Sequence, residues 1–211
     1  MRYETPGAIG ILPRPLAYSA FWLSFIRMRR PEGTPLFTLS GSRVDKQRNM
    51  IVEAVLNSKA QWLLFIDDDH LVPVDGLERL MAHNKPFVTG VYLTKNEPFR
   101  TTQMGEVEGR EGEGYASLTA EQIGSKALVP IDATGMGFTL IRREVFEALP
   151  KPWYSVAIQP NGNVKGEDVY FCEKARKAGI ELLADVSLNI PHLTPRGVVL
   201  KGDQVTMQAS E

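Results

Sequence analysis

The sequence predicts an α/β fold in which helices flank a mainly parallel central sheet. Three observations support this fold class. Strand-like and helix-like segments alternate along the 211 residues, which is the order expected of a layered α/β protein. Residues 62–66 read Trp-Leu-Leu-Phe-Ile, an unbroken apolar run typical of a strand that is covered on both faces. The chain is 43% hydrophobic and 23% charged, so it can bury one sizeable core.

The first half of the chain alternates between predicted strands and helices. We expect strands at residues 8–12, 36–39, 61–66 and 87–93. A first helix is expected over residues 15–30, because Pro15 suits a first helical turn. A second helix follows Ser42-Arg-Val-Asp45, a pattern typical of helix starts, and a third begins near Pro73.

The second half continues the alternation after a surface loop at 105–114, which is rich in glycine and glutamate. We expect strands at 129–131, 137–141 and 182–186, helices at 143–149 and 167–178, and a turn at Asn161-Gly162. No repeat or linker interrupts the pattern. The sequence therefore predicts one domain over residues 1–211, with a core at about 36–193 and a tail or lid at 194–211.

Charge and cysteine content exclude several classes of protein. The 24 basic and 25 acidic side chains leave a net charge of −1, whereas a general nucleic-acid binder is usually basic. The single cysteine, Cys172, excludes an intramolecular disulfide framework and a cysteine-based zinc cluster. We therefore expect a protein of the cytoplasm.

The longest apolar stretch runs from Leu16 to Ile26 and is too short for a spanning helix, which needs about 20 residues. Arg27, Arg29 and Arg30 follow it, whereas a signal peptide carries its charge before the apolar run. A buried helix with a basic C-terminal end is the first interpretation. An interfacial membrane helix is the alternative, and the ligand of the basic stretch, membrane or nucleic acid, stays open.

Three consecutive aspartates, Asp67, Asp68 and Asp69, stand directly after the predicted strand 61–66. Ligands of open α/β sheets bind beyond the carboxyl ends of the strands. Adjacent carboxylates repel one another, and Mg²⁺ or Mn²⁺ would relieve that repulsion. Because side chains alternate along an extended chain, Asp67 and Asp69 are expected on one side and Asp68 on the other. An acidic turn before the next helix is the alternative.

A second candidate is Gly166-Glu167-Asp168, at the start of the predicted helix 167–178. Acidic residues are favoured at helix N-termini for purely structural reasons. Helical spacing also puts Asp168, Cys172 and Ala175 on one face. We therefore expect Asp168 at the edge facing the sheet, where a carboxylate can act as a general base.

The three histidines have different expected roles. His192 follows the last predicted strand and would matter as a ligand if it meets the aspartates in space. His70 directly follows the aspartates and is a competing ligand. His83 is expected to be a cation at a helix C-terminus.

Closely spaced glycines in Gly135-Met136-Gly137 allow a backbone to approach a ligand, or serve a tight turn. The dinucleotide fingerprint, the P-loop and the serine-hydrolase elbow are absent from the sequence.

In their order along the chain, these motifs resemble the GT-A glycosyltransferases, particularly small family 2-like members found in phages and bacteria. The resemblance covers roughly residues 36–193. It rests on Arg48-Asn49, the Asp67 to Asp69 run, Asp132-Ala-Thr-Gly-Met-Gly-Phe, Gly166-Glu167-Asp168 and His192. It implies a Rossmann-like GT-A domain that moves a sugar from a nucleotide-diphosphate donor to an acceptor hydroxyl.

The resemblance also implies roles for individual residues. A divalent metal, Mn²⁺ or Mg²⁺, would be held by Asp67, Asp69 and His192. Asp168 would be the catalytic base if the enzyme inverts. The donor would be bound by Arg48, Asp67, Asp68, Gly135, Met136, Gly137 and Glu167.

The first 35 residues depart most from the family, which leaves the donor nucleotide and sugar unassigned. The acceptor is equally open: a saccharide, a lipid-linked sugar, a small molecule or modified DNA. The tail contains Arg196 and Lys201 and is expected to close over the donor as a lid. Donor-dependent protection of residues 194–205 in hydrogen exchange would test this.

Other functions remain possible for this pattern. A nucleotidyltransferase also uses an α/β sheet and metal-binding carboxylates, but Gly10-Ile-Leu-Pro-Arg14 is a poor version of its phosphate loop. A non-catalytic module that binds sugar or nucleic acid on the same fold is a further alternative. A haloacid-dehalogenase-type phosphatase would need its nucleophile on an early strand.

Overall fold

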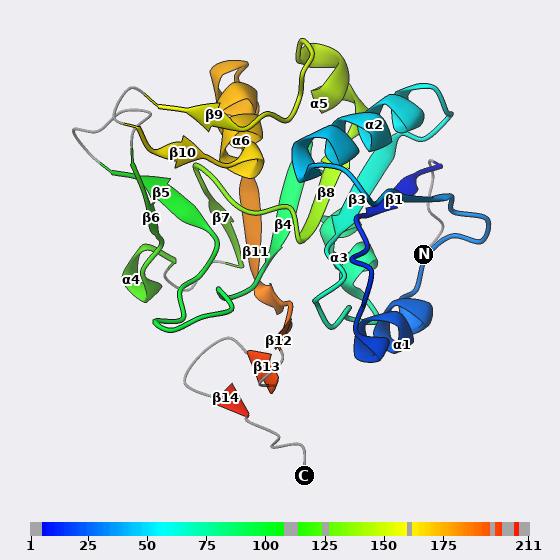
Figure 1. The fold of residues 1–211 in the computed structure, drawn as a ribbon, viewed down its shortest axis with the longest axis horizontal. Helices are drawn as coiled ribbons and strands as arrows, with labels where there is room; N and C mark the ends of the chain where they lie inside the picture. Colours follow the sequence, from blue (N-terminus) through cyan, green and yellow to red (C-terminus); the bar gives the residue numbers. More distant parts are fainter. Residues whose placement is uncertain are drawn as a thin grey trace.

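The computed structural model describes residues 6–107, 114–123, 127–159, 162–194, 197–199 and 205–206. Its main feature is a seven-stranded sheet (Figure 1). The strands are β1 (Ala8–Ile11), β2 (Leu36–Thr38), β3 (Trp62–Ile66), β4 (Phe87–Val91), β7 (Leu128–Pro130), β8 (Phe138–Arg142) and β11 (Leu183–Asn189). They lie in the order β2-β1-β3-β8-β4-β11-β7.

The sheet is mainly parallel, as the sequence predicts. Strands β2, β1 and β3 are parallel neighbours, and so are β4 and β11. Strand β8 lies between β3 and β4 and is antiparallel to both, so those two blocks point the same way. At the other edge β7 is antiparallel to β11. Five strands therefore end at the same edge, which we call the site edge.

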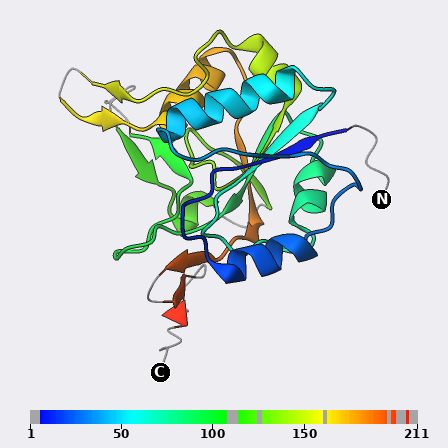
Figure 2. The same ribbon diagram turned by 45° about the vertical axis from the view of Figure 1, so that its right-hand side comes forward.

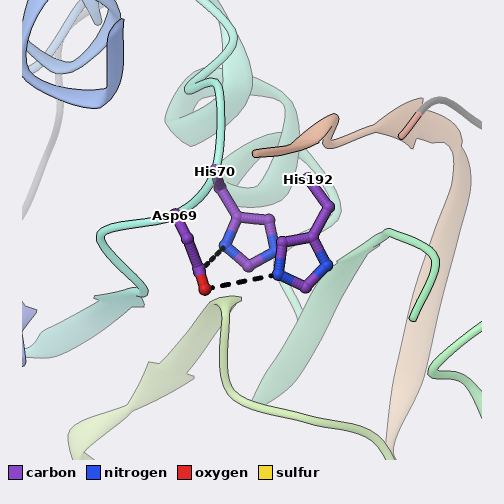
Figure 3. Close-up of side chains that lie close together, drawn as sticks. All are labelled: Asp69, His70 and His192. Atoms are coloured by element: carbon purple, nitrogen blue, oxygen red, sulfur yellow. Dashed lines mark ion pairs between the residues drawn. The ribbon is translucent and has the colours of Figure 1, made fainter. Parts of the chain in front are cut away.

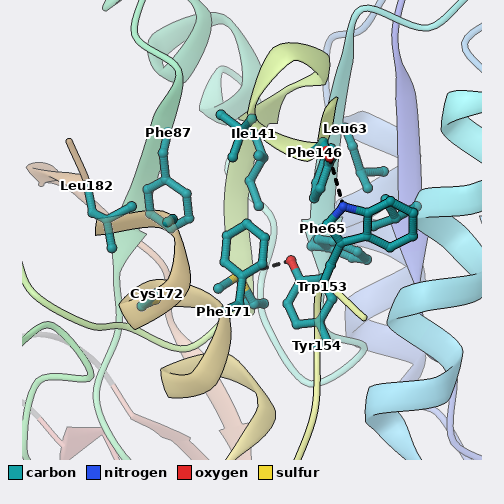
Figure 4. Packing of buried hydrophobic residues seen from close by; sticks show 14 of the residues in the cluster. Leu63, Phe65, Phe87, Ile141, Phe146, Trp153, Tyr154, Phe171, Cys172 and Leu182 are labelled. Carbon is teal, nitrogen blue, oxygen red and sulfur yellow. Dashed lines mark hydrogen bonds between the residues drawn. The ribbon is translucent and has the colours of Figure 1, made fainter. Parts of the chain in front are cut away.

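Helices cover both faces of this sheet (Figure 2). They are α1 (Ser19–Arg27), α2 (Val44–Leu56), α3 (Gly76–Ala82), α4 (Ala120–Ile123), α5 (Arg143–Ala148) and α6 (Glu167–Lys177). Helices α2, α5 and α6 contribute to one buried cluster, of which Figure 4 shows the aromatic part. Helices α1 and α3 contribute to the cluster on the opposite face. This is the three-layer arrangement of α/β folds.

Strand β3 shows why its sequence is apolar throughout. Leu63 and Phe65 pack into the cluster under α2, α5 and α6, whereas Trp62, Leu64 and Ile66 pack into the cluster under α1 and α3. All five side chains are fully buried, and each stabilises the fold by about 1.5–3 kcal/mol.

Several short elements were not predicted from the sequence. They are β5 (Met104–Glu106), β6 (Tyr115–Ser117), β9 (Ala157–Ile158), β10 (Val164–Lys165), β12 (His192–Thr194), β13 (Gly197–Val199), β14 (Val205–Thr206) and the helix α4. These segments have two to four residues, too few to show a period of two or 3.6.

The predicted helix at 15–30 is shorter in the structure, where α1 begins at Ser19. The preceding residues form a loop because Arg14 turns toward the aspartates after β3. Most of the predicted surface loop at 105–114, the Asn161 half of the predicted turn and the cations Arg196 and Lys201 of the predicted lid lie outside the described residues.

Among the described residues, none of the helices is long and apolar enough to span a bilayer.

Candidate functional site

The site edge brings together segments that lie far apart in the sequence. Because β1, β3, β4 and β11 end there, the residues that follow each of these strands meet at this edge. Strand β8 begins there because it runs the opposite way, so Gly135–Gly137 lie at the same place. The fold therefore collects most of the candidate residues in one region.

Asp69, His70 and His192 form a buried cluster at this edge (Figure 3). The Asp69 carboxylate lies beside the two rings, 3.3 Å from His70 Nδ1 and 3.4 Å from His192 Nε2. The two imidazoles stack with their centroids 4.4 Å apart. One candidate ligand atom from each residue lies within 4.8 Å of the others. His70, the competing ligand in the sequence, thus belongs to the cluster.

Backbone pairing holds these residues in place. His70 and His192 are partners in an isolated antiparallel bridge. The Leu71 N–H donates to Pro191 O at 2.8 Å, and the Leu193 N–H donates to Asp69 O at 2.6 Å. The strand that begins at His192 is therefore tied directly to the turn after β3.

The hydrogen bond on the far side of His192 fixes the chemistry of its ring. Nδ1 lies 2.8 Å from Leu93 O, and a carbonyl can only accept, so the proton sits on Nδ1. Nε2 lies 3.4 Å from the Asp69 carboxylate and is buried without a hydrogen bond to any described group. A ring nitrogen held in this way beside a carboxylate is in a position to bind a metal ion.

Two cations, Lys95 and Arg14, also contact the Asp69 carboxylate. Arg14 Nη1 lies 3.3 Å from Oδ2. Burial alone would raise the pKa of Asp69, but the contacts with His192, His70 and Lys95 lower it well below its usual range. For His70, burial and the neighbouring His192 lower the pKa to about 4. His70 is therefore neutral near pH 7 and can act as a ligand.

The donor set fits a divalent transition metal. Two imidazoles and a carboxylate are typical ligands for Mn²⁺ and its heavier neighbours, whereas Mg²⁺ prefers oxygen ligands. Both ring nitrogens of His70 and Nε2 of His192 are buried and make no hydrogen bond with any described group. A metal at this place would satisfy them. The carbonyl of Leu93 supports His192 in the manner usual for metal-bound histidines.

A second group, the Arg48 cluster, lies beside the first. Arg48 is 3% exposed and lies near three carboxylates: Asp67 at 3.5 Å, Glu167 at 3.5 Å and Asp168 at 3.4 Å. Its guanidinium is over the rings of Phe65 and Tyr154, at 5.1 and 5.9 Å. Such stacking on aromatic faces suits arginine and not lysine.

Asn49 explains why Arg48 is held so firmly. Its side-chain amide donates to the carbonyls of Asp45 and Tyr154 and accepts from the N–H groups of Trp153 and Tyr154. These bonds attach the segment after α5 to helix α2, so that the Tyr154 ring closes over the guanidinium.

Asp168 has the most unusual carboxylate of the Arg48 cluster. Burial raises the pKa of Asp168 to about 8, and the like charges of Glu167 and Asp67 act in the same direction, while Arg48 opposes them. Its Oδ1 atom is buried without a hydrogen bond to any described group, although the side chain as a whole is 27% exposed. As predicted, Cys172 and Ala175 are buried on the same helical face.

Tyr92 separates the two clusters. Its hydroxyl accepts a hydrogen bond from the Gly137 N–H at 2.9 Å, and its ring lies against that of His70 at 4.5 Å. A Cβ atom at Gly137 would meet His70 at 2.6 Å, and one at Gly135 would meet the Tyr92 hydroxyl at 2.5 Å. The two glycines are thus required by close packing within the site.

The aspartates do not alternate as predicted. Asp67 lies in the Arg48 cluster, whereas Asp68 and Asp69 both contact Arg14. The reason is that β3 ends at Ile66 and residues 68–69 form a turn, so the two-residue period no longer applies. The cluster of possible metal ligands is therefore Asp69, His70 and His192, and Asp67 is not part of it.

Other candidates have roles that differ from those expected. Asp68 is buried and bonded to the Arg14 backbone and guanidinium at 2.7 and 2.8 Å. The Met136 side chain is fully buried in the core and contacts the Tyr154 hydroxyl. Only the backbone of Met136 is therefore available to a ligand. His83 caps α3 as predicted and also pairs with Asp185 at 3.0 Å.

Two residues of the site were not predicted: Tyr92 and Lys95. Both follow β4, which ends at the site edge. That position was the available signal, because ligand sites in such sheets lie beyond the strand ends. The residue types alone gave no signal that these residues belong to the site. Arg14, after β1, was considered as the end of a poor phosphate loop, and its contacts with Asp68 and Asp69 were not predicted.

Neither the known protein-family models nor the curated proteins include a match to this sequence. Among solved structures, the crystal structure of A197 from STIV has a TM-score of 0.63 and 20% sequence identity, and the match covers 97% of this chain and 98% of that chain. The two proteins thus share a fold over nearly their whole lengths.

Two further crystal structures resemble the chain weakly. The apo form of UDP-glucose pyrophosphorylase has a TM-score of 0.41 and 10% identity, with 74% of this chain and 57% of that one covered. A complex of UDP-glucose pyrophosphorylase with UDP-glucose has a TM-score of 0.43 and 8% identity, with 85% and 72% covered. These similarities are too weak to assign a function.

Proposed function

We propose that the protein is a metal-dependent glycosyltransferase that moves a sugar from a nucleotide-diphosphate donor to an acceptor hydroxyl. One observation carries the proposal: the Asp69 carboxylate lies 3.3 Å from His70 Nδ1 and 3.4 Å from His192 Nε2, next to a cluster that contains a carboxylate of raised pKa. A cation site beside a general base matches what such a transfer needs.

Asp69, His70 and His192 would hold the metal. When bound, it would stabilise the negative charge that develops on the departing diphosphate. Because the donor set contains two imidazoles, Mn²⁺ is favoured over Mg²⁺. This narrows the choice of cofactor that the aspartates alone leave open.

The chain's own residues would perform the remaining tasks. Asp168 would accept the proton of the acceptor hydroxyl on the carboxylate oxygen that does not contact Arg48, and its raised pKa makes it a stronger base than an ordinary aspartate. Arg48, at 3.4 Å, would keep that carboxylate in place. The backbone at Gly135–Gly137 would approach the donor, while Asp68 would keep Arg14 beside Asp69.

Thermal shift with nucleotide-sugars tests the proposal. UDP-, GDP- and dTDP-sugars are each added with and without Mn²⁺. A rise in Tm for one donor that requires Mn²⁺ is expected. Stabilisation by nucleoside triphosphates alone, with no response to any nucleotide-sugar, would instead support the nucleotidyltransferase alternative.

A matched pair of variants locates the effect. Asp69→Asn is expected to abolish the metal-dependent rise in Tm. Asp75→Asn changes another aspartate, one whose side chain makes no capping bond at α3, and should leave the rise intact. An Asp69→Asn protein that responds to Mn²⁺ and donor like the wild type would exclude the proposed site.

A further inference from the structure

Helix α1 is apolar on two opposite faces. Phe21, Phe25 and Met28 are buried against the sheet. Leu23 is 61% exposed and Ile26 is 69% exposed. At about 100° of rotation per residue, Leu23 and Ile26 lie opposite the buried face. A surface helix normally carries polar residues there, so the outer face of α1 is built for an apolar environment.

Two further exposed aliphatic residues lie at the two ends of α1. Leu16, in the loop before α1, is 89% exposed. Val74, which is 43% exposed, lies at the far end of the helix, where its carbonyl accepts a hydrogen bond from the Arg29 N–H at 2.8 Å. Leu16, Leu23, Ile26 and Val74 together form what we call the α1 surface.

Basic residues gather at one end of the α1 surface. A hollow of about 670 Å³ is lined by residues 26–34 and Glu78. The residues that line it include three arginines and two glutamates: Arg27, Arg29, Arg30, Glu32 and Glu78. Arg29 pairs with Glu78, and Arg30 donates to the carbonyls of Phe25 and Met28. Arg27 is exposed at the rim. The hollow thus carries excess positive charge next to exposed aliphatic side chains.

We propose that the α1 surface docks onto an anionic lipid bilayer. Its aliphatic side chains would enter the interface, and the arginine-lined hollow would take a lipid phosphate. Apolar residues on one face with basic residues beside them are the composition of interfacial helices. Attraction to anionic lipids requires the local positive charge that the hollow supplies, even though the whole chain has a net charge of −1.

The α1 surface lies near the site. Both ribbon views place α1 at the same end of the molecule as β12, which begins at His192 (Figures 1 and 2). Ser24 of α1 accepts a hydrogen bond from the Val72 N–H at 2.9 Å, two residues beyond His70. Arg14, just before α1, contacts Asp68 and Asp69. Docking would therefore hold the site edge at the bilayer surface.

This position has a consequence for the acceptor, which rests on the proposed function. A site held at a bilayer suits a hydroxyl carried by a lipid more than one on a free small molecule. Membrane docking itself does not depend on sugar transfer, because it is measured by binding alone.

Vesicle flotation tests the docking with the full chain. Vesicles of phosphatidylcholine alone are compared with vesicles that contain 30% phosphatidylglycerol. The wild type should float with the anionic vesicles, and binding should weaken as salt rises. The double variant Leu23→Ser with Ile26→Ser should bind at least tenfold less, and Arg27→Glu about threefold to tenfold less.

Ile158→Ser is the matched control, because Ile158 is 80% exposed on β9, away from α1. It should bind like the wild type. Circular dichroism should show that all variants keep the fold, since the changed side chains point outward. Failure of the wild type to bind either vesicle would overturn the proposal. So would an equal loss in Ile158→Ser, or Arg27-dependent binding to duplex DNA in place of vesicles.

Discussion

The two clusters at the site edge differ in their charge balance. In one, the carboxylates of Asp68 and Asp69 are matched by two cations, Lys95 and Arg14, and Asp69 also contacts two imidazoles. In the other, a single cation, Arg48, serves three carboxylates. The pKa values follow: that of Asp69 is lowered, and that of Asp168 is raised. The site edge thus holds one ionised carboxylate that suits a cation, Asp69, and a second carboxylate that suits proton acceptance, Asp168.

The Arg48 cluster should be the more fragile of the two, because it depends on one cation. Replacement of Arg48 with methionine would leave Asp67, Glu167 and Asp168 without a counter-charge. Removal of one partner from a buried ion pair typically costs about 3–5 kcal/mol. Urea unfolding should show a loss of that size.

Lys85→Met is the control for this prediction, since Lys85 forms an exposed pair with Glu181 and such pairs contribute less than about 1 kcal/mol. Equal losses for both variants would mean that the charge balance of the Arg48 cluster is not what matters.

Asp168→Asn should lower the transfer rate by about a hundredfold while metal and donor still raise Tm. In the wild type, the rate should rise with pH through about 8, because Asp168 must be deprotonated to act as a base. A flat rate between pH 6 and pH 9 would exclude Asp168 as that base.

The same carboxylate gives a stability signature. Its folded pKa of about 8 lies above the unfolded value of about 3.9, so the folded state binds more protons between these values. Its ionisation therefore costs stability as pH rises from about 4 to 8. Asp168→Asn should be more stable than the wild type above pH 8 and equal to it below pH 4, as measured by Tm.

Gly137→Ala tests whether the clusters are coupled through Tyr92. The new Cβ would lie 2.6 Å from His70 and 3.0 Å from Tyr92, and such overpacking costs about 1–3 kcal/mol. Both Mn²⁺ affinity and the pH profile should shift. Gly166→Ala, where a Cβ meets nothing within 4 Å, should lower stability by about 0.5–1 kcal/mol, because Gly166 is the N-cap of α6, and should leave Mn²⁺ affinity unchanged. A change in only one of the two functional measurements would show that the clusters act separately.

Lys95→Ala should have the smallest effect, and in the opposite direction. Lys95 contacts the carboxylate that would bind the metal, so its removal should increase Mn²⁺ affinity about threefold to tenfold. Isothermal titration measures this. Lys85→Ala, which removes an exposed pair with Glu181, should leave the affinity unchanged. Weaker Mn²⁺ binding by Lys95→Ala would show that the lysine supports the site and does not compete for it.

Much of the architecture could be predicted, because long apolar runs such as residues 62–66 and helical stripes such as Ile51, Val52 and Val55 have clear periods. The meeting of the Asp run with His192 was expected only if the strand ends share an edge. The strand ends do share an edge. That arrangement depends on the order of strands in the sheet, which the local sequence does not encode.

The partition of the aspartates could not be predicted, because it depends on where β3 ends and the turn begins. One residue of difference moves Asp67 from one cluster to the other. The role of Arg48 was also misjudged in part. The resemblance placed it against a ligand, whereas its 3% exposure makes it a buried counter-ion for three carboxylates.

The position of β8 in the sheet has a consequence for synthesis on the ribosome. Strand β3 ends at Ile66 and β4 at Val91, yet β8, which lies between them in the sheet, finishes only at Arg142. Until that segment emerges, two apolar strands have unpaired inner edges, which are prone to pair with other chains. A nascent chain of this protein is therefore most vulnerable to aggregation during the interval when residues 92–142 are being translated.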